Sequence, residues 1–154
     1  MMRICLPLLL LWTWIIGSAA AQGPVTSKAI EQARNGKVDA AATTIEDATL
    51  GLEGDDPMTW YVKAFIHKTL YVERDGRAAG SQARDVAVGA VLRCHELDGS
   101  GRLSERRMPL LAFLAETHLE DARDAIRTSR PGDARAAQRH FEQYTLLQSA
   151  ADSE

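Results

Sequence analysis

The sequence predicts an all-α fold in which helices pair as hairpins. Two observations lead to this prediction: apolar residues recur every three or four positions between proline and glycine breaks, and almost no stretch alternates in the manner of a β-strand. A third observation is a motif that repeats in well-separated helices. The chain has 154 residues, 45% of them hydrophobic, which is enough for one domain with a modest packed core.

The first 21 residues have the pattern of a secretory signal peptide. Arg3 precedes an apolar run that ends at Ile16, and small residues follow it up to Ala21. We expect cleavage after Ala21 and export, so that the protein is periplasmic or secreted and has no stable membrane insertion. An uncleaved N-terminal anchor is the alternative, although the strongly apolar part is shorter than the ~20 residues that span a membrane.

The chain from residue 22 to residue 149 is expected to form one helical domain. Its three predicted hairpins cover 26–50, 57–97 and 105–149, and the last residues, 150–154, are expected to fray. Cys5 is lost with the leader, so Cys94 cannot form an intramolecular disulfide and the domain must be held together by packing.

The first hairpin begins with a short helix that Thr26 or Ser27 can cap. Gly36 ends this helix, because glycine tolerates the left-handed conformation found after a helix C-terminus. A second helix then runs from about Lys37 to Leu50. Its inner face is expected to contain Val38, Ala41, Ile45 and Ala48.

The second hairpin opens with a strong start signal, Asp56 followed by Pro57. The carboxylate can accept from the first free amides, and the N–H donor that proline lacks is not needed at the first helical position. This helix continues to about Arg74, and its two apolar stripes predict contacts on two sides. A further helix lies within Ala78 to Leu97. The inner residues expected for the pair are Trp60, Tyr61, Ala64, Phe65, His67, Tyr71 and Val72, then Ala83, Val86, Ala87, Ala90, Val91, Cys94 and Leu97.

The third hairpin is predicted to begin near Pro109, in the first turn of the fifth helix. Residues 102–108 are then expected to form an exposed approach to that helix or a frayed turn. The sixth helix runs from Asp133 to about Ser149. The inner residues expected for this pair are Leu111, Leu114, His118, Ala122 and Ala125, then Ala137, Phe141, Tyr144 and Leu147.

The second helices of the hairpins share a motif. From Gly36 the chain reads G-x-x-x-A-A-x-x-x-I-E, and from Gly132 it reads G-x-x-x-A-A-x-x-x-F-E. A small residue allows the paired helix to approach closely, and the larger residue one turn later fills the space beside it. Ala87 and Val91 have the same spacing in the fourth helix.

This pattern resembles the tetratricopeptide repeat (TPR) family, whose units pair an aromatic and a small residue on the first helix with A-x-x-x-F on the second. Ala137 and Phe141 match the second-helix motif, and Trp60 with Ala64 fits the first. The repeats are longer, because the small residues of successive motifs are 46 and 50 residues apart where the family period is about 34.

The resemblance implies helical hairpins stacked as a short right-handed solenoid, with the first helices lining a shallow concave surface. It also implies a non-catalytic scaffold that binds a protein or peptide in the cell envelope. Polar positions on the first helices that a partner can reach are Gln32, Lys63, Lys68 and Glu116.

The stretch from Glu96 to Ser104 looks like the middle of a helix-loop-helix calcium site. Its ends do not fit, because Glu96 replaces the usual first aspartate and Arg107 stands where such a loop needs a bidentate glutamate. We therefore expect no metal at this loop, which also serves as a connection between helices.

The histidines and the cysteine offer no recognisable metal or catalytic pattern. His67 and His118 fall on inner faces, where a hydrogen-bonded core histidine is the usual role, whereas His95 and His140 are expected to be solvated. Cys94 is expected to be a small buried residue, with an intermolecular disulfide as the alternative.

Several function classes are disfavoured. A net charge of −3 without long runs of one sign argues against a nucleic-acid partner. The carboxylate pair at 120–121 is interpreted as a solvated helix face, and no motif for a catalytic site or a cofactor is present. The competing class is a small-ligand or catalytic pocket around Trp60, His67 and His118, and a third is a subunit that only self-associates.

Overall fold

The computed structural model describes residues 23–128 and 133–153. Within these ranges no strand occurs, and the predicted all-α class is confirmed. The helices there follow one another as α1 (Pro24–Arg34), α2 (Val38–Leu50), α3 (Pro57–Glu73), α4 (Gln82–Leu97), α5 (Ser104–Thr128) and α6 (Asp133–Asp152). The predicted leader, from Met1 to Ala21, lies outside the described residues. In the described part of the chain, no helix combines the length and the apolar character needed to cross a membrane.

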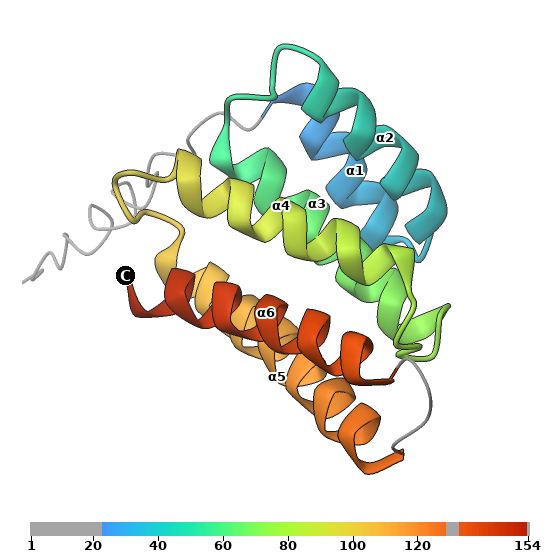
Figure 1. The fold of residues 1–154 in the computed structure, drawn as a ribbon. Helices are drawn as coiled ribbons and strands as arrows, with labels where there is room; N and C mark the ends of the chain where they lie inside the picture. Colours follow the sequence, from blue (N-terminus) through green and yellow to red (C-terminus); the bar gives the residue numbers. More distant parts are fainter. Residues whose placement is uncertain (1–22, 129–132, 154) are drawn as a thin grey trace, which may run out of the picture.

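The helices associate as three consecutive pairs. The closest neighbours are α1 with α2, α3 with α4, and α5 with α6. Figure 1 shows the α3–α4 pair between the other two. The middle pair contacts one side through α2 and α1, and the other side through α5 and α6. The chain therefore places α3 and α4 at the centre of the molecule.

Helix ends follow the sequence signals at several points. The Asp56 carboxylate accepts from the Met58 amide at 3.0 Å, as predicted for the start of α3. Ser81 caps α4 in the same way by accepting from the Arg84 amide at 3.1 Å. Gly36, with φ +73°, makes the tight turn from α1 to α2 that a side chain would strain.

The start of α1 differs from expectation. The helix begins at Pro24, and Thr26 lies inside its first turn, where it is buried and shares a hydrogen bond with Thr59. Neither Thr26 nor Ser27 is the cap. Glu53 takes that role from the α2–α3 loop, because its carboxylate accepts from the amides of Val25 at 2.9 Å and Thr26 at 2.8 Å.

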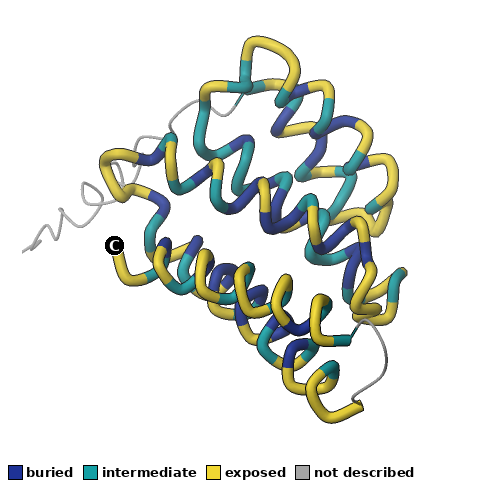
Figure 2. Tube along the Cα trace, viewed as in Figure 1, coloured by how far each residue is buried: buried dark blue, intermediate teal, exposed yellow. Residues whose placement is uncertain are grey.

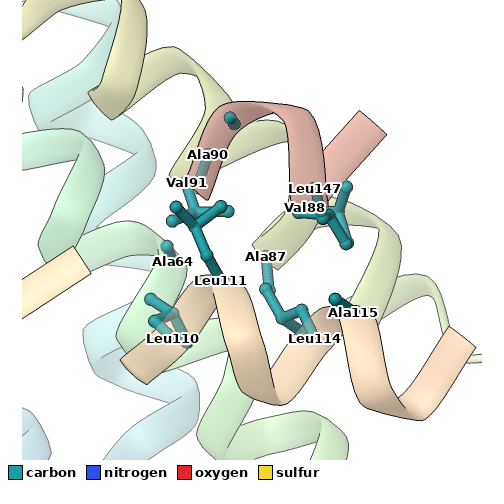
Figure 3. Close-up of a cluster of buried hydrophobic side chains, with 11 residues drawn as sticks. Ala64, Ala87, Val88, Ala90, Val91, Leu110, Leu111, Leu114, Ala115 and Leu147 are labelled. Atoms are coloured by element: carbon teal, nitrogen blue, oxygen red, sulfur yellow. The ribbon is translucent and has the colours of Figure 1, made fainter. Parts of the chain in front are cut away.

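The core consists of two main clusters that meet at α3. One cluster joins α1, α2 and α3 around Ala29, Ala41, Ile45, Ala48, Val62 and Ile66. The other joins α3 to α6, and Figure 3 shows its aliphatic side chains meeting between the helices. Alanines contribute to both clusters, since Ala41, Ala64 and Ala87 are each fully buried. The predicted two-sided burial of α3 is thus present, although Phe65 and Trp60 lie nearer the surface than expected.

The start of α5 was predicted wrongly. The helix begins at Ser104 and carries Pro109 in its interior. Residues 102–108 are not an exposed approach, because Leu103 and Arg107 are buried. An ion pair between Arg107 and Asp98 holds this first turn against the end of α4. Such a pairing cannot be recognised from the spacing of apolar residues.

The last helix also departs from its predicted pattern. Phe141 was expected to be an inner residue, but it is 56% exposed, since none of the helices in residues 23–128 and 133–153 covers that side of α6. Figure 2 shows exposed residues along much of α6. Its buried residues are Ala137, Leu147 and Ala150. The helix continues to Asp152, so the expected fraying from Ala150 is not seen there.

Candidate functional site

A groove between α1 and α3 is the principal candidate site. Its volume is about 660 Å³, which lies in the range of ~300–1,000 Å³ that is common for ligand pockets. Most of the lining comes from the first helices of the pairs. The lining residues are Ser27, Ile30, Glu31, Ala33, Arg34, Asn35, Val38, Met58, Tyr61, Val62, Phe65, Ile66, Thr69 and Arg106.

The groove face of α3 follows from helical geometry. Met58, Tyr61, Val62, Phe65 and Thr69 recur every three or four positions, so they lie along one side of the helix. Val62 is buried against α1 and α2, whereas Phe65 is 49% exposed. The result is an apolar floor with one large aromatic side chain open to solvent.

Charges of both signs surround this floor. Arg34 at the end of α1 and Arg106 in the first turn of α5 contribute positive charge, and Glu31 contributes negative charge. Tyr61 also lines the groove. Burial raises the pKa of Tyr61, against the opposing effect of the Arg106 guanidinium, so its hydroxyl keeps its proton. The groove can therefore hold an apolar group and an acidic group side by side.

The four predicted partner-binding residues do not line this groove. Lys63 is paired with Glu46 at 2.8 Å, and only 12% of its side chain is exposed. Lys68 lies over the ring of Phe113 at 5.1 Å. Glu116 is exposed on α5, and the side-chain oxygen of Gln32 is buried without a hydrogen-bond partner. Lys68 also lies 5.7 Å from the centroid of the Phe65 ring and is therefore next to the groove, but the structure does not bring the four residues together as one site.

The competing pocket around Trp60, His67 and His118 is not assembled either. The Trp60 indole donates to the Gly54 carbonyl at 2.7 Å, and His67 lies beside Glu46 with its Nε2 atom 3.7 Å from the carboxylate. Burial lowers the pKa of His67, although the Glu46 charge opposes this effect. His118 lies elsewhere, beside α6.

The loop that resembles a calcium site is closed by an internal ion pair. Asp98 accepts from the amides of Leu103 at 2.7 Å and Arg102 at 3.1 Å, and its Oδ2 atom also accepts from Arg107 at 3.0 Å. Both side chains of the ion pair are 1% exposed. Burial alone would raise the pKa of Asp98, but the Leu103 amide and Arg107 outweigh it and lower that pKa. The Arg107 guanidinium therefore already binds the carboxylate that a calcium ion would need as a ligand.

A buried arginine forms a second polar centre, between α3, α4 and α5. Arg84 is fully buried, and its guanidinium contacts Asp121 at 2.5 Å. The Ala79 carbonyl accepts from it as well, and the guanidinium lies over the Tyr71 ring at 5.3 Å from the centroid. Asp121, interpreted from sequence as part of a solvated face, is thus a partner of a core charge.

Two histidines meet beside this centre. The Nδ1 atoms of His118 on α5 and His140 on α6 are 3.1 Å apart. His140 was expected to be solvated, and that prediction is wrong because the ring packs against His118 at a centroid distance of 5.4 Å. Burial lowers the pKa of His118 to about 4, and the positive charge of Arg84 and contact with His140 add to this effect.

Sequence reasoning missed these pairs, although one signal was present. Arg84 lies three residues before Ala87 and four before Val88, so it continues the buried stripe of α4 into the first turn. A charged residue on such a stripe requires a buried partner. The partner, Asp121, is 37 residues away and could not be identified by spacing.

The remaining ionisable groups do not form a recognisable metal centre. Among residues 23–128 and 133–153, no cluster of three or more histidine, cysteine, aspartate or glutamate side chains could hold a metal ion. Cys94 is buried in the α4 stripe, with Arg107 near its sulfur at 3.9 Å.

Comparison with known proteins leaves the assignment to the structure. No family model, no curated protein and no solved structure matches the chain.

Proposed function

We propose that this protein is an exported, non-catalytic scaffold that binds a short segment of a partner protein in the groove between α1 and α3. The groove is the observation that supports this proposal most directly, because it combines an apolar floor, an exposed aromatic side chain and two arginines at its edge. Export is inferred from the leader pattern of the first 21 residues.

In this proposal the three helix pairs are a TPR-like unit, stacked as a short right-handed solenoid. The small and large residues of the shared motif support it in two pairs, since Ala41 with Ile45 and Ala87 with Val91 are all buried. The groove lining also supports it, because α1 and α3 contribute most residues and α5 contributes Arg106. These are the helices expected to form the concave side.

The partner segment should carry an apolar side chain near a carboxylate. Phe65 is 49% exposed, and full burial of a side chain of that size is worth ~1.5–3 kcal/mol, so covering the exposed half should contribute roughly half of that value. Arg34 and Arg106 can each bind a carboxylate through two parallel hydrogen bonds. No histidine or cysteine is among the residues that line the groove, so binding is a better explanation of it than catalysis.

Selection from a phage-displayed library of random peptides tests the proposal. The purified protein is the bait, and a Phe65→Asp variant serves for counter-selection. We expect enriched peptides to share an apolar residue and an acidic residue, and their affinity, measured by fluorescence anisotropy, to fall at least tenfold for Phe65→Asp. Arg106→Ser should weaken binding and reduce its dependence on salt.

The matched control is Leu52→Asp, because Leu52 is fully exposed in the α2–α3 loop and does not line the groove. This variant should bind the peptides with unchanged affinity. Equal loss of binding in Leu52→Asp and Phe65→Asp would refute the assignment of the groove, and so would a selection that enriches no peptide over the counter-selected variant.

A further inference from the structure

The contact between His118 and His140 is the only histidine pair that the described residues bring to hydrogen-bond distance. It joins the middle of α5 to the first half of α6. Although α6 lies along α5, that half of it contributes few residues to the core, because Ala137 is its one buried residue before Leu147. The pair is therefore a polar contact between α5 and α6 where α6 buries little apolar surface.

The separation of 3.1 Å allows one proton between the two Nδ1 atoms. In a neutral pair, one ring donates from Nδ1 and the other accepts with its lone pair. One additional proton can be placed on His140 at its other nitrogen without breaking this hydrogen bond. A proton on His118 as well would leave two positive rings with facing N–H groups and no acceptor between them.

The surroundings make that second proton costly. The Nε2 atom of His118 is buried and has no hydrogen-bond partner, so its ring cannot share charge with the protein. Arg84 on α4 and Arg139 on α6 add positive charge near the pair, whereas Asp85 on α4 and Asp121 on α5 add negative charge. Asp121 is already paired with Arg84, which reduces the compensation it can give.

Water can reach the pair through a cavity of about 850 Å³ between α4 and α6. Both histidines line it, together with the apolar side chains Val88 and Leu92. Protons can thus arrive from solvent without unfolding of the core. Separation of the first half of α6 would widen this cavity and expose Val88, which otherwise packs in the core cluster with Leu147 (Figure 3).

We propose that the His118–His140 contact is an acid-released latch between α5 and α6, closed while the facing nitrogens share one proton and opened when each ring carries its own. It does not depend on the peptide-binding groove, which lies on α1 and α3. An exported protein meets pH changes that the cytoplasm does not impose, and this latch would convert acidification into exposure of the α4 surface under α6.

Acidification favours the open latch, because His118 binds a proton less readily when the latch is closed. Its pKa is about 4 when the latch is closed and 6.5 when it is open, so the open form binds one more proton in the range between these values. The contribution of the pair to the stability of the closed form is complete above pH ~6.5 and is lost as the pH falls toward 4. Uptake of one proton on opening changes the equilibrium constant for opening tenfold per pH unit between the two pKa values. Because pH 7 lies above this range, the open fraction increases by about 20-fold from pH 7 to pH 5.

Hydrogen exchange measured by mass spectrometry tests the latch. Protection factors, corrected for the intrinsic pH dependence of exchange, are compared for amides of residues 137–144 in α6 and residues 41–48 in α2, in buffer with EDTA. We expect α6 protection to fall by about 20-fold between pH 7 and pH 5 while α2 changes much less. A fall of equal size in both helices, or no fall in α6, would refute the latch without use of any variant.

The double variant His118→Gln/His140→Gln identifies the groups responsible. Glutamine can form a hydrogen bond across the interface but does not titrate in this range. The selective loss of α6 protection should therefore disappear in the double variant and persist in His67→Gln, a control with a buried histidine outside the pair. If the selective loss of α6 protection at low pH persists in the double variant, the proposal is overturned. Selective protection of α6 by added zinc at pH 7, absent from the double variant, would overturn it in favour of a metal site.

Discussion

Replacing Arg107 with methionine should remove a large share of the stability of this fold. The substitution keeps most of the side-chain volume but leaves the Asp98 carboxylate buried without its counter-charge, since both side chains are 1% exposed. Removal of one partner of a buried ion pair typically costs ~3–5 kcal/mol. The amides of Leu103 and Arg102 still donate to Asp98, so we expect a value near the lower end.

The expected loss is large relative to the total. A domain of this size is commonly stable by ~5–15 kcal/mol, and a loss of ~3 kcal/mol corresponds to a decrease in Tm of roughly 10 °C. Urea unfolding followed by circular dichroism at 222 nm measures the change in free energy. Arg93→Met is the matched control, because Arg93 pairs with Glu96 on the same helix while both side chains remain about half exposed. It should cost less than ~1 kcal/mol.

The pH dependence gives a second check on the same ion pair. The pKa of Asp98 is lowered in the folded protein, so its contribution to stability is present above its unfolded pKa of about 3.8 and is lost as the pH falls through the lower folded value. Arg107→Met should weaken this acid sensitivity. Equal stability losses in Arg107→Met and Arg93→Met would show that the buried ion pair does not hold α5 against α4.

Three substitutions and the addition of calcium test other parts of the fold. Ala87→Leu forces a larger side chain into a fully buried helix contact, and it should lower the free energy of unfolding in urea by ~1–3 kcal/mol. Gly89→Ala, on the exposed side of the same helix, should raise it by ~0.5–1 kcal/mol. The opposite order of stability would contradict the packing described. Glu53→Ala removes the acceptor for two amides at the start of α1 and should cost ~1–2 kcal/mol, with hydrogen exchange increased first at the amide of Val25. Millimolar calcium should leave Tm unchanged, because Arg107 already occupies the Asp98 carboxylate; a rise in Tm that Asp98→Ala abolishes would contradict this.

The helices were predictable from sequence because their signals are local. Spacing of three and four residues identified most inner faces, and Asp56 with Pro57 marked the start of α3 through contacts within two residues. No local sequence signal identified the groove between α1 and α3. The residues that line the groove could not be chosen from sequence. Periodicity shows that a polar residue such as Lys63 lies off the inner face of its helix, but not whether it is open to solvent or paired with a residue of the preceding helix.

Two of the errors come from side-chain pairing between different helices, and a third comes from a helix face that no described helix covers. Pro109 suggested a helix start, but the ion pair of Arg107 with Asp98 stabilises an earlier turn. His140 was judged by its own helix, whereas its position is decided by His118. Phe141 fits the family motif, yet a motif describes burial by a following helix, and no helix in the described part of the chain follows α6.

The sharing of α3 by two core clusters determines how the chain can come apart. Val62 and Ile66 belong to the cluster with α1 and α2, whereas Ala64 belongs to the cluster with α4, α5 and α6. Unfolding can therefore be graded: the first two helices can detach as one cooperative unit while the other four keep their own cluster, but α3 cannot melt without opening both. Detachment of the first unit would bare an aliphatic strip at Val62 and Ile66, so α1 and α2 protect the N-terminal end of the stack from association with another chain.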